Sequence, residues 1–291
     1  MSELLSSELT LNDAGKLYHL NIGNEDIANT IILVGDQTRV KLVASFFDAI
    51  TFETQHREFA TITGVYQGKS ISVISHGIGC DNMDIVLTEI DAAVNIDLAT
   101  RKVKSGLTQL NLIRIGTCGA LQAEIEVGSA IISKYAIGMD GVANFYDIPF
   151  GDKIQDGLKA FNAHMAWEKP SVIPYMAMAD QGLVNLLSDL GKEGITITAN
   201  GFYGPQGRSI RIPLKDENFK TKIRTFEWDG EQVLNLEMET SGLLSLAEAL
   251  GHQAVTICLA IANRYNHSFV SDFEATMCQL IKNVLDKTLK L

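Results

Sequence analysis

Apolar residues along this chain occur in short unbroken runs, separated by polar stretches and by turns that contain glycine. The runs have the length of strands that are buried on both faces. Stretches with helical spacing of apolar residues lie between several of them, so the pattern predicts an α/β fold with a central parallel or mixed sheet flanked by helices. The predicted strands are 29–34, 58–66, 69–76, 128–137, 194–199, 233–239 and 254–262, together with the run that begins at Leu110.

Six segments between these strands carry the apolar spacing and the end signals of helices. They are 40–47, 82–102, 181–190, 218–228, 240–250 and 273–289. Residues 1–28 lack a firm period and are interpreted as an extended N-terminal arm. Residues 138–174 are interpreted as an irregular polar segment, suited to an insertion or to contact with a partner. We find no repeat and no interdomain linker, so we expect one domain that spans residues 1–291.

The charge balance excludes a general affinity for polyanions. The chain has 24 Lys and Arg against 35 Asp and Glu, a net charge of −11. We therefore expect no binding to nucleic-acid backbones or to anionic membranes. Any phosphate that the protein binds should be small and held by a few placed arginines.

The four cysteines are scattered, without a CxxC pair or a His/Cys cluster at zinc spacing. We expect reduced thiols, a cytoplasmic location and no metal site. The acidic N-terminus lacks the apolar core of a signal peptide, and the apolar run 254–262 is too short to span a bilayer.

One arginine stands inside an apolar run. Arg114 follows Leu110–Ile113 and precedes the small-residue segment Gly116–Gly119, which is interpreted as a turn. A charge buried in such a strand is costly unless a bound anion or a buried carboxylate compensates it. In the first case the N–H groups of the turn and the Thr117 hydroxyl would bind the same anion. In the second case Arg114 is a structural residue paired with a core glutamate.

Further polar groups stand where predicted strands end. Gly35 and Arg39 follow the first strand, Glu237 and Glu239 end another, and Arg264 follows the last. Ligands of open α/β sheets bind beyond the carboxyl ends of strands, so one pocket is expected to collect three arginines and two carboxylates. Arginines hold phosphate in a forked geometry, and carboxylates accept hydrogen bonds from sugar hydroxyls. The competing interpretation is that the two glutamates flank an ordinary strand exit.

The segment Gly201–Arg208 carries three side chains suited to a flat heterocycle. Phe202 can stack on a ring, Gln206 offers a donor and an acceptor, and Arg208 offers only donors. Together Gln206 and Arg208 match an acceptor–NH–acceptor edge such as that of uracil. A surface turn rich in glycine and proline is the alternative.

With these residues, the chain resembles the nucleoside phosphorylase I family from about Tyr18 to its last helix. The resemblance depends on several motifs taken together: Gly35-Asp36-x-x-Arg39, His56-Arg57-Glu58-Phe59, Gly77-Ile78-Gly79, Arg114-Ile-Gly-Thr117, Phe202-Tyr203-x-x-Gln206-x-Arg208, Glu237-Met238-Glu239 and Asn263-Arg264. It implies a single-domain α/β fold with a central mixed sheet and dimers as the unit of assembly. It also implies reversible phosphorolysis of uridine to uracil and ribose 1-phosphate, with inorganic phosphate as co-substrate and no cofactor.

The resemblance further implies a role for each site residue. Phosphate would be bound by Gly35, Arg39, Arg114 and Thr117, with Arg57 reaching in from the neighbouring subunit. Uracil would be bound by Phe202, Gln206 and Arg208. Ribose would be bound by Glu237, Met238 and Glu239, and the N-terminal arm of the partner would bring its His19 to the 5′-hydroxyl. The catalytic residues would be Arg114, Arg208 and Glu239.

Some relatives bind a monovalent cation between subunits through a glutamate, a backbone carbonyl and a serine. Glu58 and Ile78 match the first two, but Asn82 stands at the serine position. We therefore assign no metal there.

Two other functions stay open on the same fold. A purine nucleoside phosphorylase or a related nucleosidase would have an aspartate after the last strand to protonate the purine, and Arg264 stands there instead. The arginines expected at the phosphate also argue against a hydrolase, which needs water rather than an anion. A non-catalytic nucleoside or phosphate sensor would use the same pocket and is the third possibility.

Overall fold

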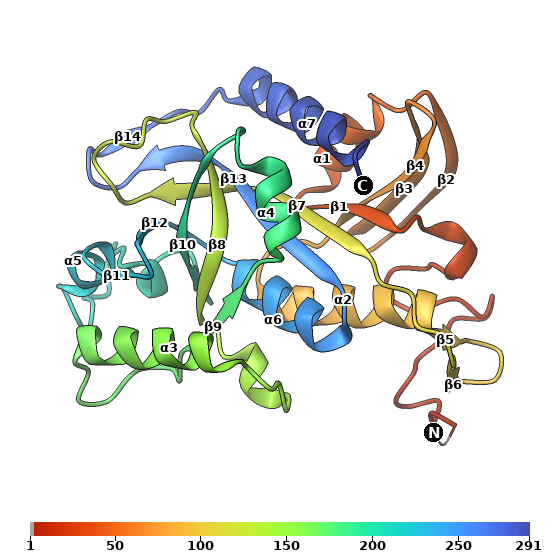
Figure 1. Cartoon of the computed structure of the whole chain (residues 1–291), viewed down its shortest axis with the longest axis horizontal. Helices are drawn as coiled ribbons and strands as arrows, with labels where there is room; N and C mark the ends of the chain where they lie inside the picture. Colours follow the sequence, from red (N-terminus) through yellow and green to blue (C-terminus); the bar gives the residue numbers. More distant parts are fainter. Residues whose placement is uncertain (1–2) are drawn as a thin grey trace.

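The computed structural model describes residues 3–291, so Met1 and Ser2 of the predicted arm lie outside the described residues. A twelve-stranded mixed sheet forms its centre and helices lie on both sides (Figure 1). The predicted α/β fold with a central mixed sheet is confirmed. The strands of the sheet are β1 (Thr30–Val34), β2 (Ala49–His56), β3 (Phe59–Tyr66), β4 (Lys69–Ser75), β7 (Asn111–Ala120), β8 (Ala130–Met139), β9 (Tyr175–Met178), β10 (Lys192–Ala199), β11 (Glu227–Trp228), β12 (Glu231–Glu237), β13 (Gln253–Asn263) and β14 (Ser268–Phe269).

Helices α1, α4 and α7 lie on one side of the sheet, and α2 and α6 pack together on the other (Figure 1). No helix in residues 3–291 is long and apolar enough to cross a membrane. The helices are α1 (Gln37–Ala44), α2 (Cys80–Asn95), α3 (Asp152–Met165), α4 (Gln181–Leu187), α5 (Phe219–Arg224), α6 (Thr240–Leu250) and α7 (Glu274–Thr288), with short 3₁₀ turns η1 (Asn24–Asp26), η2 (Val142–Phe145) and η3 (Gly204–Gln206).

Strand β1 sets the position of the first glycine turn. All of its residues are buried, as predicted from its unbroken apolar run. It pairs in parallel with β4 and β7, so that Val34 lies opposite both Ser75 and Ile115. Gly35 therefore leaves the sheet between the residues that follow β4 and the Gly116 segment of β7.

Five strands close into a ring. Strand β13 pairs with β7 in parallel and with β8 in antiparallel, while β10 pairs in parallel with β8 and β12. Strand β12 then pairs back onto β7, with Leu236 opposite Gly119. The sheet is closed on this side, because β12 has hydrogen-bonded neighbours at both edges. The ring brings the end of β12 next to the end of β7.

The segment Gly116–Gly119 is not a turn. Strand β7 continues through it to Ala120, and β13 pairs with it along this length, with Cys258 opposite Gly116. The sequence-based interpretation was therefore wrong, because hydrogen bonds to the neighbouring strand outweigh the weak local preference of these small residues.

Residues 138–174 are not irregular throughout, since α3 occupies Asp152–Met165. Its buried residues Ile154, Phe161 and Met165 have helical spacing, but Gly157 interrupts the pattern. A Cβ at Gly157 would lie 2.6 Å from the Met176 sulfur, so the glycine allows β9 to approach the helix. Gly157, a residue that weakens a helical pattern, is therefore present here because β9 packs closely against α3.

Other elements also differ from the prediction. The helix expected over 82–102 ends at Asn95, where the chain enters a small separate hairpin of β5 (Ile96–Asp97) and β6 (Lys102–Val103). The helix expected over 218–228 ends at Arg224, and Glu227–Trp228 form β11. No strand was predicted at 49–56, where β2 lacks buried residues.

The N-terminal segment is not an extended arm in its described part. Leu17, Leu20 and Ile22 are fully buried and belong to the main hydrophobic core. The backbone N–H of Leu17 donates to the Ile22 carbonyl at 3.0 Å, which folds this segment back on itself. The apolar side chains of residues 3–28 therefore hold it against the sheet.

Candidate active site

A cavity of about 750 Å³ opens where β1, β7 and β12 end or bend. It collects residues from segments far apart in the sequence, as the strand-end pattern predicted. Every predicted site residue except His19 and Arg57 lines it: Gly35, Arg39, Arg114, Thr117, Phe202, Gln206, Arg208, Glu237, Met238 and Glu239. Arg264 was also expected to line this pocket, and it does not.

Arg114 is both paired and in the cavity wall. Its Nη1 lies 3.0 Å from Glu237 Oε2, and its Nη2 donates to Glu239 Oε2. Burial alone would lower the pKa of Arg114, but Glu239 and Glu237 raise it above its ordinary value. The two interpretations of this arginine are therefore compatible: core glutamates compensate its charge, and the guanidinium still borders the cavity.

The two glutamates are held in place by separate hydrogen bonds. Glu237 accepts the Thr198 hydroxyl at 2.6 Å, and the backbone N–H groups of Glu239 and Thr240, both at 2.9 Å. Glu239 accepts the backbone N–H of Gly79 at 2.7 Å. Burial raises the pKa of Glu239, while Arg114 and the Gly79 N–H act against that rise. Both carboxylates are thus fixed before any ligand arrives.

Arg39 differs from Arg114 in having no carboxylate partner. It stands in the first turn of α1, whose N-terminus is capped by Asp36 through the Thr38 N–H at 2.6 Å. Burial lowers the pKa of Arg39, which Asp36 partly opposes and the nearby Arg114 reinforces. Within residues 3–291, Arg39 forms no ion pair, whereas Arg114 forms two. A partly buried cation facing a cavity without a counter-ion is suited to an anionic ligand.

The far end of the cavity is formed by the loop around η3. The Arg208 guanidinium lies 3.9 Å from the centre of the Phe202 ring, and its Nη1 donates to Gln206 Oε1 at 2.6 Å. Burial lowers the pKa of Arg208. Gln206 is buried, and 52% of the Phe202 surface is exposed, so the loop offers an amide, a guanidinium and an open aromatic face together.

Arg264 lies close enough to Arg208 for their charges to interact. Its Cγ and Cδ would be 3.3 Å from a Cβ at Gly119, so it packs against β7. Burial and the nearby Arg208 charge lower the pKa of Arg264 to about 10. Its Nη1 is buried without a hydrogen-bond partner among the described residues. Two positive charges, those of Arg208 and Arg264, therefore lie close together at this part of the cavity.

His19 and Arg57 lie together outside the cavity of their own chain. The Arg57 guanidinium is 6.0 Å from the centre of the Tyr18 ring, and that ring is 5.1 Å from the His19 ring. Glu89 accepts from the backbone N–H of Leu20 at 2.8 Å and lies 2.6 Å from His19 Nδ1. The two residues expected to act across a subunit interface thus form one surface group.

Sequence reasoning missed His76 and Thr198. Both are fully buried, and each contacts a predicted residue: His76 meets Arg114 at 3.2 Å, and Thr198 meets Glu237 at 2.6 Å. His76 directly follows a buried strand, as the predicted residues do, and that position was the available signal. Thr198 offers no such signal in the sequence, because β-branched residues are common in strands and several occur in β10.

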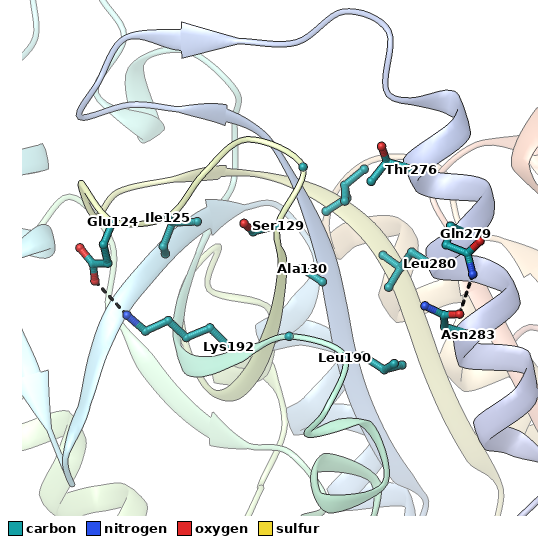
Figure 2. Close-up of a pocket in the computed structure, with 13 residues that line it drawn as sticks. Glu124, Ile125, Ser129, Ala130, Leu190, Lys192, Thr276, Gln279, Leu280 and Asn283 are labelled. Atoms are coloured by element: carbon teal, nitrogen blue, oxygen red, sulfur yellow. Dashed lines mark hydrogen bonds and ion pairs between the residues drawn. The ribbon is translucent and has the colours of Figure 1, made fainter.

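A second cavity, of about 530 Å³, lies between β8, β13 and α7 (Figure 2). Its one acid, Glu124, lies 2.8 Å from its one lysine, Lys192. Gln279 and Asn283 of α7 bond to each other at 2.8 Å (Figure 2). Its charges are therefore already paired, and the first cavity is the candidate active site.

Residues 29–290 match the sequence model of the phosphorylase superfamily. This chain belongs to that superfamily. A uridine phosphorylase from Thermococcus kodakarensis is 30% identical, over 92% of this chain and 85% of that protein. A guanosine phosphorylase from Halorubrum lacusprofundi is 25% identical, over 84% and 83%. A solved nucleoside phosphorylase from Trypanosoma brucei, described as showing uridine phosphorylase activity, is 28% identical with a TM-score of 0.89, covering 97% of this chain and 100% of that one.

Proposed function

We propose that this protein catalyses the reversible phosphorolysis of uridine to uracil and ribose 1-phosphate. One observation carries the proposal: a single cavity is lined by Arg39, which has no ion pair among residues 3–291, by the fixed carboxylate of Glu239, and by the Gln206–Arg208 pair. We assign Arg39 to an oxyanion, Glu239 to a sugar and the Gln206–Arg208 pair to a pyrimidine. The uridine phosphorylases among its relatives support the same substrate.

At the first end, Gly35, Arg39, Arg114 and Thr117 would bind phosphate. Arg39 supplies the charge, because Arg114 is already shared between two carboxylates. Gly35 and Thr117 add backbone and hydroxyl donors around the same point. This arrangement would orient a phosphate oxygen toward the anomeric carbon of a bound nucleoside.

In the centre, Glu239 and Met238 would contact ribose, with Glu237 behind them. The C1′–O bond to phosphate would form as the C1′–N1 bond breaks, and the electron pair of that bond would leave with uracil. The sugar then acquires oxocarbenium character, which the phosphate and the Glu239 carboxylate stabilise. Because Gly79 and Arg114 hold Glu239 beforehand, it needs little reorganisation during the reaction.

At the far end, Phe202 would stack on uracil while Gln206 and Arg208 bind its edge. Arg208 would stabilise the negative charge that develops on the departing base. The charge of Arg264 close to Arg208 adds to this field. A base with acceptor atoms on that edge fits such a site, since arginine only donates.

A purine substrate is the second candidate, since a guanosine phosphorylase is among the relatives. Against it, the residue that follows Asn263 at the end of β13 is Arg264, a cation with no proton to give at neutral pH. Turnover of uridine, inosine, guanosine and methylthioadenosine, each with and without phosphate, tests the assignment. We expect release of uracil from uridine that depends on phosphate. Faster purine release would contradict the base assignment, and release without phosphate would indicate a hydrolase. Tight uridine binding without any cleavage would indicate a sensor.

We further propose that the working unit is a dimer in which His19 and Arg57 of each subunit complete the partner's cavity. The charges at the phosphate end support this, because Glu237 and Glu239 already share Arg114, so Arg39 supplies a single free positive charge among residues 3–291 for a phosphate dianion. An additional cation is needed, and Arg57 belongs to an ordered, exposed group with Tyr18 and His19.

Subunit complementation tests this arrangement. R39A and R57A homodimers should both be weak, and random mixed dimers carry one intact cavity in half of the population. Mixing should therefore restore about a quarter of wild-type activity. No recovery in mixed dimers, verified by differently tagged subunits, would place Arg57 in its own chain's site.

We also propose a cytoplasmic location. The four cysteines are free, and Cys80, Cys118 and Cys258 are buried among other side chains. Unpaired buried thiols are typical of proteins from a reducing compartment.

A further inference from the structure

His76 follows β4 and lies inside the wall of the phosphate end of the cavity. It is fully buried, and its backbone N–H donates to the Val34 carbonyl at 2.8 Å, so β1 fixes its position. Its ring passes the backbone of Gly35, where an added Cβ would lie 3.7 Å from His76 Cε1. The imidazole thus reaches across the end of β1 to Arg114 on β7.

The contact with Arg114 defines which nitrogen of His76 carries the proton. Arg114 Nε lies 3.2 Å from His76 Nε2. An arginine Nε–H only donates, so His76 Nε2 accepts through its lone pair and the ring proton is on Nδ1. The neutral ring is also favoured electrostatically: burial, with Arg114 and Arg39 nearby, keeps the pKa of His76 well below its ordinary value.

Each of the three nitrogens of Arg114 therefore has a polar partner. Nε is held by His76, Nη1 by Glu237 and by the Cys258 sulfur at 3.5 Å, and Nη2 by Glu239. A guanidinium is planar, so a partner on Nε fixes the rotation that the two carboxylates alone would allow about their own contacts. The orientation of the guanidinium N–H groups that border the cavity is then fixed before phosphate binds.

We propose that His76 is a positioning residue, whose neutral imidazole holds Arg114 Nε and so directs the guanidinium toward phosphate. The proposal rests on the proposed function in taking phosphate as the anion. It assigns His76 no contact with substrate. The proposal predicts that removing the acceptor at His76 Nε2 weakens phosphate binding selectively. It also predicts that another acceptor at the same place restores phosphate binding.

His76→Met and His76→Gln form a matched pair, because the two side chains are of similar length and only glutamine keeps a strong acceptor near the Nε2 position. In H76M, the KM for phosphate should rise about 10- to 100-fold, the range for losing a hydrogen bond to a charged group. In the same variant the KM for uridine should change by less than about threefold. In H76Q, the KM for phosphate and the KM for uridine should both stay within about threefold of the wild type. Calorimetric titration with inorganic phosphate alone should show the same order of affinities.

Three results would overturn the proposal: H76M that binds phosphate as the wild type does, H76Q that loses as much as a folded H76M, or equal losses for uridine and phosphate. If H76M does not fold, nitrogen-15 spectra of histidine-labelled wild-type protein decide, because an Nε2–H tautomer of His76 is incompatible with the proposal. The titration needs no turnover. Phosphate binding without uridine cleavage in the wild type would therefore refute the proposed function while leaving the role of His76 open to the same comparison of variants.

Discussion

The guanidinium of Arg114 lies directly over the backbone of Gly116. A Cβ at residue 116 would be 2.6 Å from Arg114 Nη1 and 2.9 Å from the Cys258 sulfur. Strand β7 thus carries a long cationic side chain forward along its own face, and the glycine two residues later provides the space. The orientation of Arg114 toward Glu237 and Glu239 depends on that absence of a side chain.

Gly116→Ala should displace the Arg114 guanidinium, because its neighbours on β13 and β12 leave it little room to move. We expect kcat/KM for phosphorolysis to fall at least about 10-fold, equivalent to losing one good hydrogen bond to a charged group. Steady-state kinetics on uridine and phosphate measure this. Gly106→Ala is the control, since a Cβ there would meet no atom within 4 Å. An unimpaired G116A enzyme would show that the position of Arg114 is unimportant.

Arg208→Ala should remove stabilisation of the charge that develops on the departing uracil. Loss of one such donor typically costs about 10²- to 10³-fold in kcat. Single-turnover uracil release is the measurement, because it isolates bond cleavage from product release. Arg211→Ala serves for comparison, since Arg211 is exposed in the same loop and does not line the cavity. Equal activities of the two variants would refute the role given to Arg208.

Arg39→Met should weaken phosphate more than uridine. Arg39 is the cation at that end without a carboxylate partner among residues 3–291, so its charge is available to the ligand. We expect the KM for phosphate to rise about 10- to 100-fold, with a smaller change for uridine. Lys41→Met removes a charge from the exposed face of the same helix and should leave both constants near wild type. If both substitutions raised the KM for phosphate equally, the effect would come from the overall electrostatic field and not from a contact between Arg39 and phosphate.

Thr198→Val should destabilise the fold through the network behind Glu237. The Thr198 hydroxyl donates to Glu237 at 2.6 Å and accepts the Ser241 N–H at 2.9 Å, so valine leaves buried groups unpaired. The free energy of unfolding should fall by about 1–3 kcal/mol. Thr61→Val is the matched change, because the buried Thr61 hydroxyl has no partner in the described chain, and it should be neutral or stabilising. Urea unfolding of both variants measures these changes. Equal decreases in the free energy of unfolding would show that the network around Thr198 contributes nothing specific.

Acid should destabilise the wild type more than H76Q. The pKa of His76 is lowered well below 6.5 by burial and by Arg114, so the unfolded chain takes up a proton below about pH 6.5 that the folded chain does not. The unfolded state then binds more protons, and stability is lost as the pH falls. The difference between wild type and H76Q should change by up to about 1.4 kcal/mol per pH unit below that point. Urea unfolding at several pH values from about 7 to about 5 measures it. Parallel curves would mean that His76 is protonated in the fold.

Residues that follow buried strands were predictable, because a strand buried on both faces leaves an unbroken apolar run in the sequence. Strands β1 and β13 were found this way, and so were the polar residues after β1 and at the end of β12. Helix α6 was predicted from its first residue to the glycine that ends it, Gly251, which has a positive φ of 81°.

What could not be predicted depends on partners distant in the sequence. Gly116 was interpreted as part of a turn, but the guanidinium of Arg114 and Cys258 of β13 occupy the space where its side chain would be. His76 acquires its role from Arg114, 38 residues away. Arg264 stands at a strand end as several site residues do, yet it packs against Gly119 of β7 and does not line the cavity.

The ring made by β7, β13, β8, β10 and β12 separates the two tasks of the cavity. Arg114 and Glu237 stand on strands of a structure without a free edge, which gives these two of the proposed sugar and phosphate residues a rigid foundation. Phe202, Gln206 and Arg208 stand on a connection outside it. If these residues bind the base as proposed, changes to that connection can alter which nucleobase is accepted while the strands of the ring stay as they are.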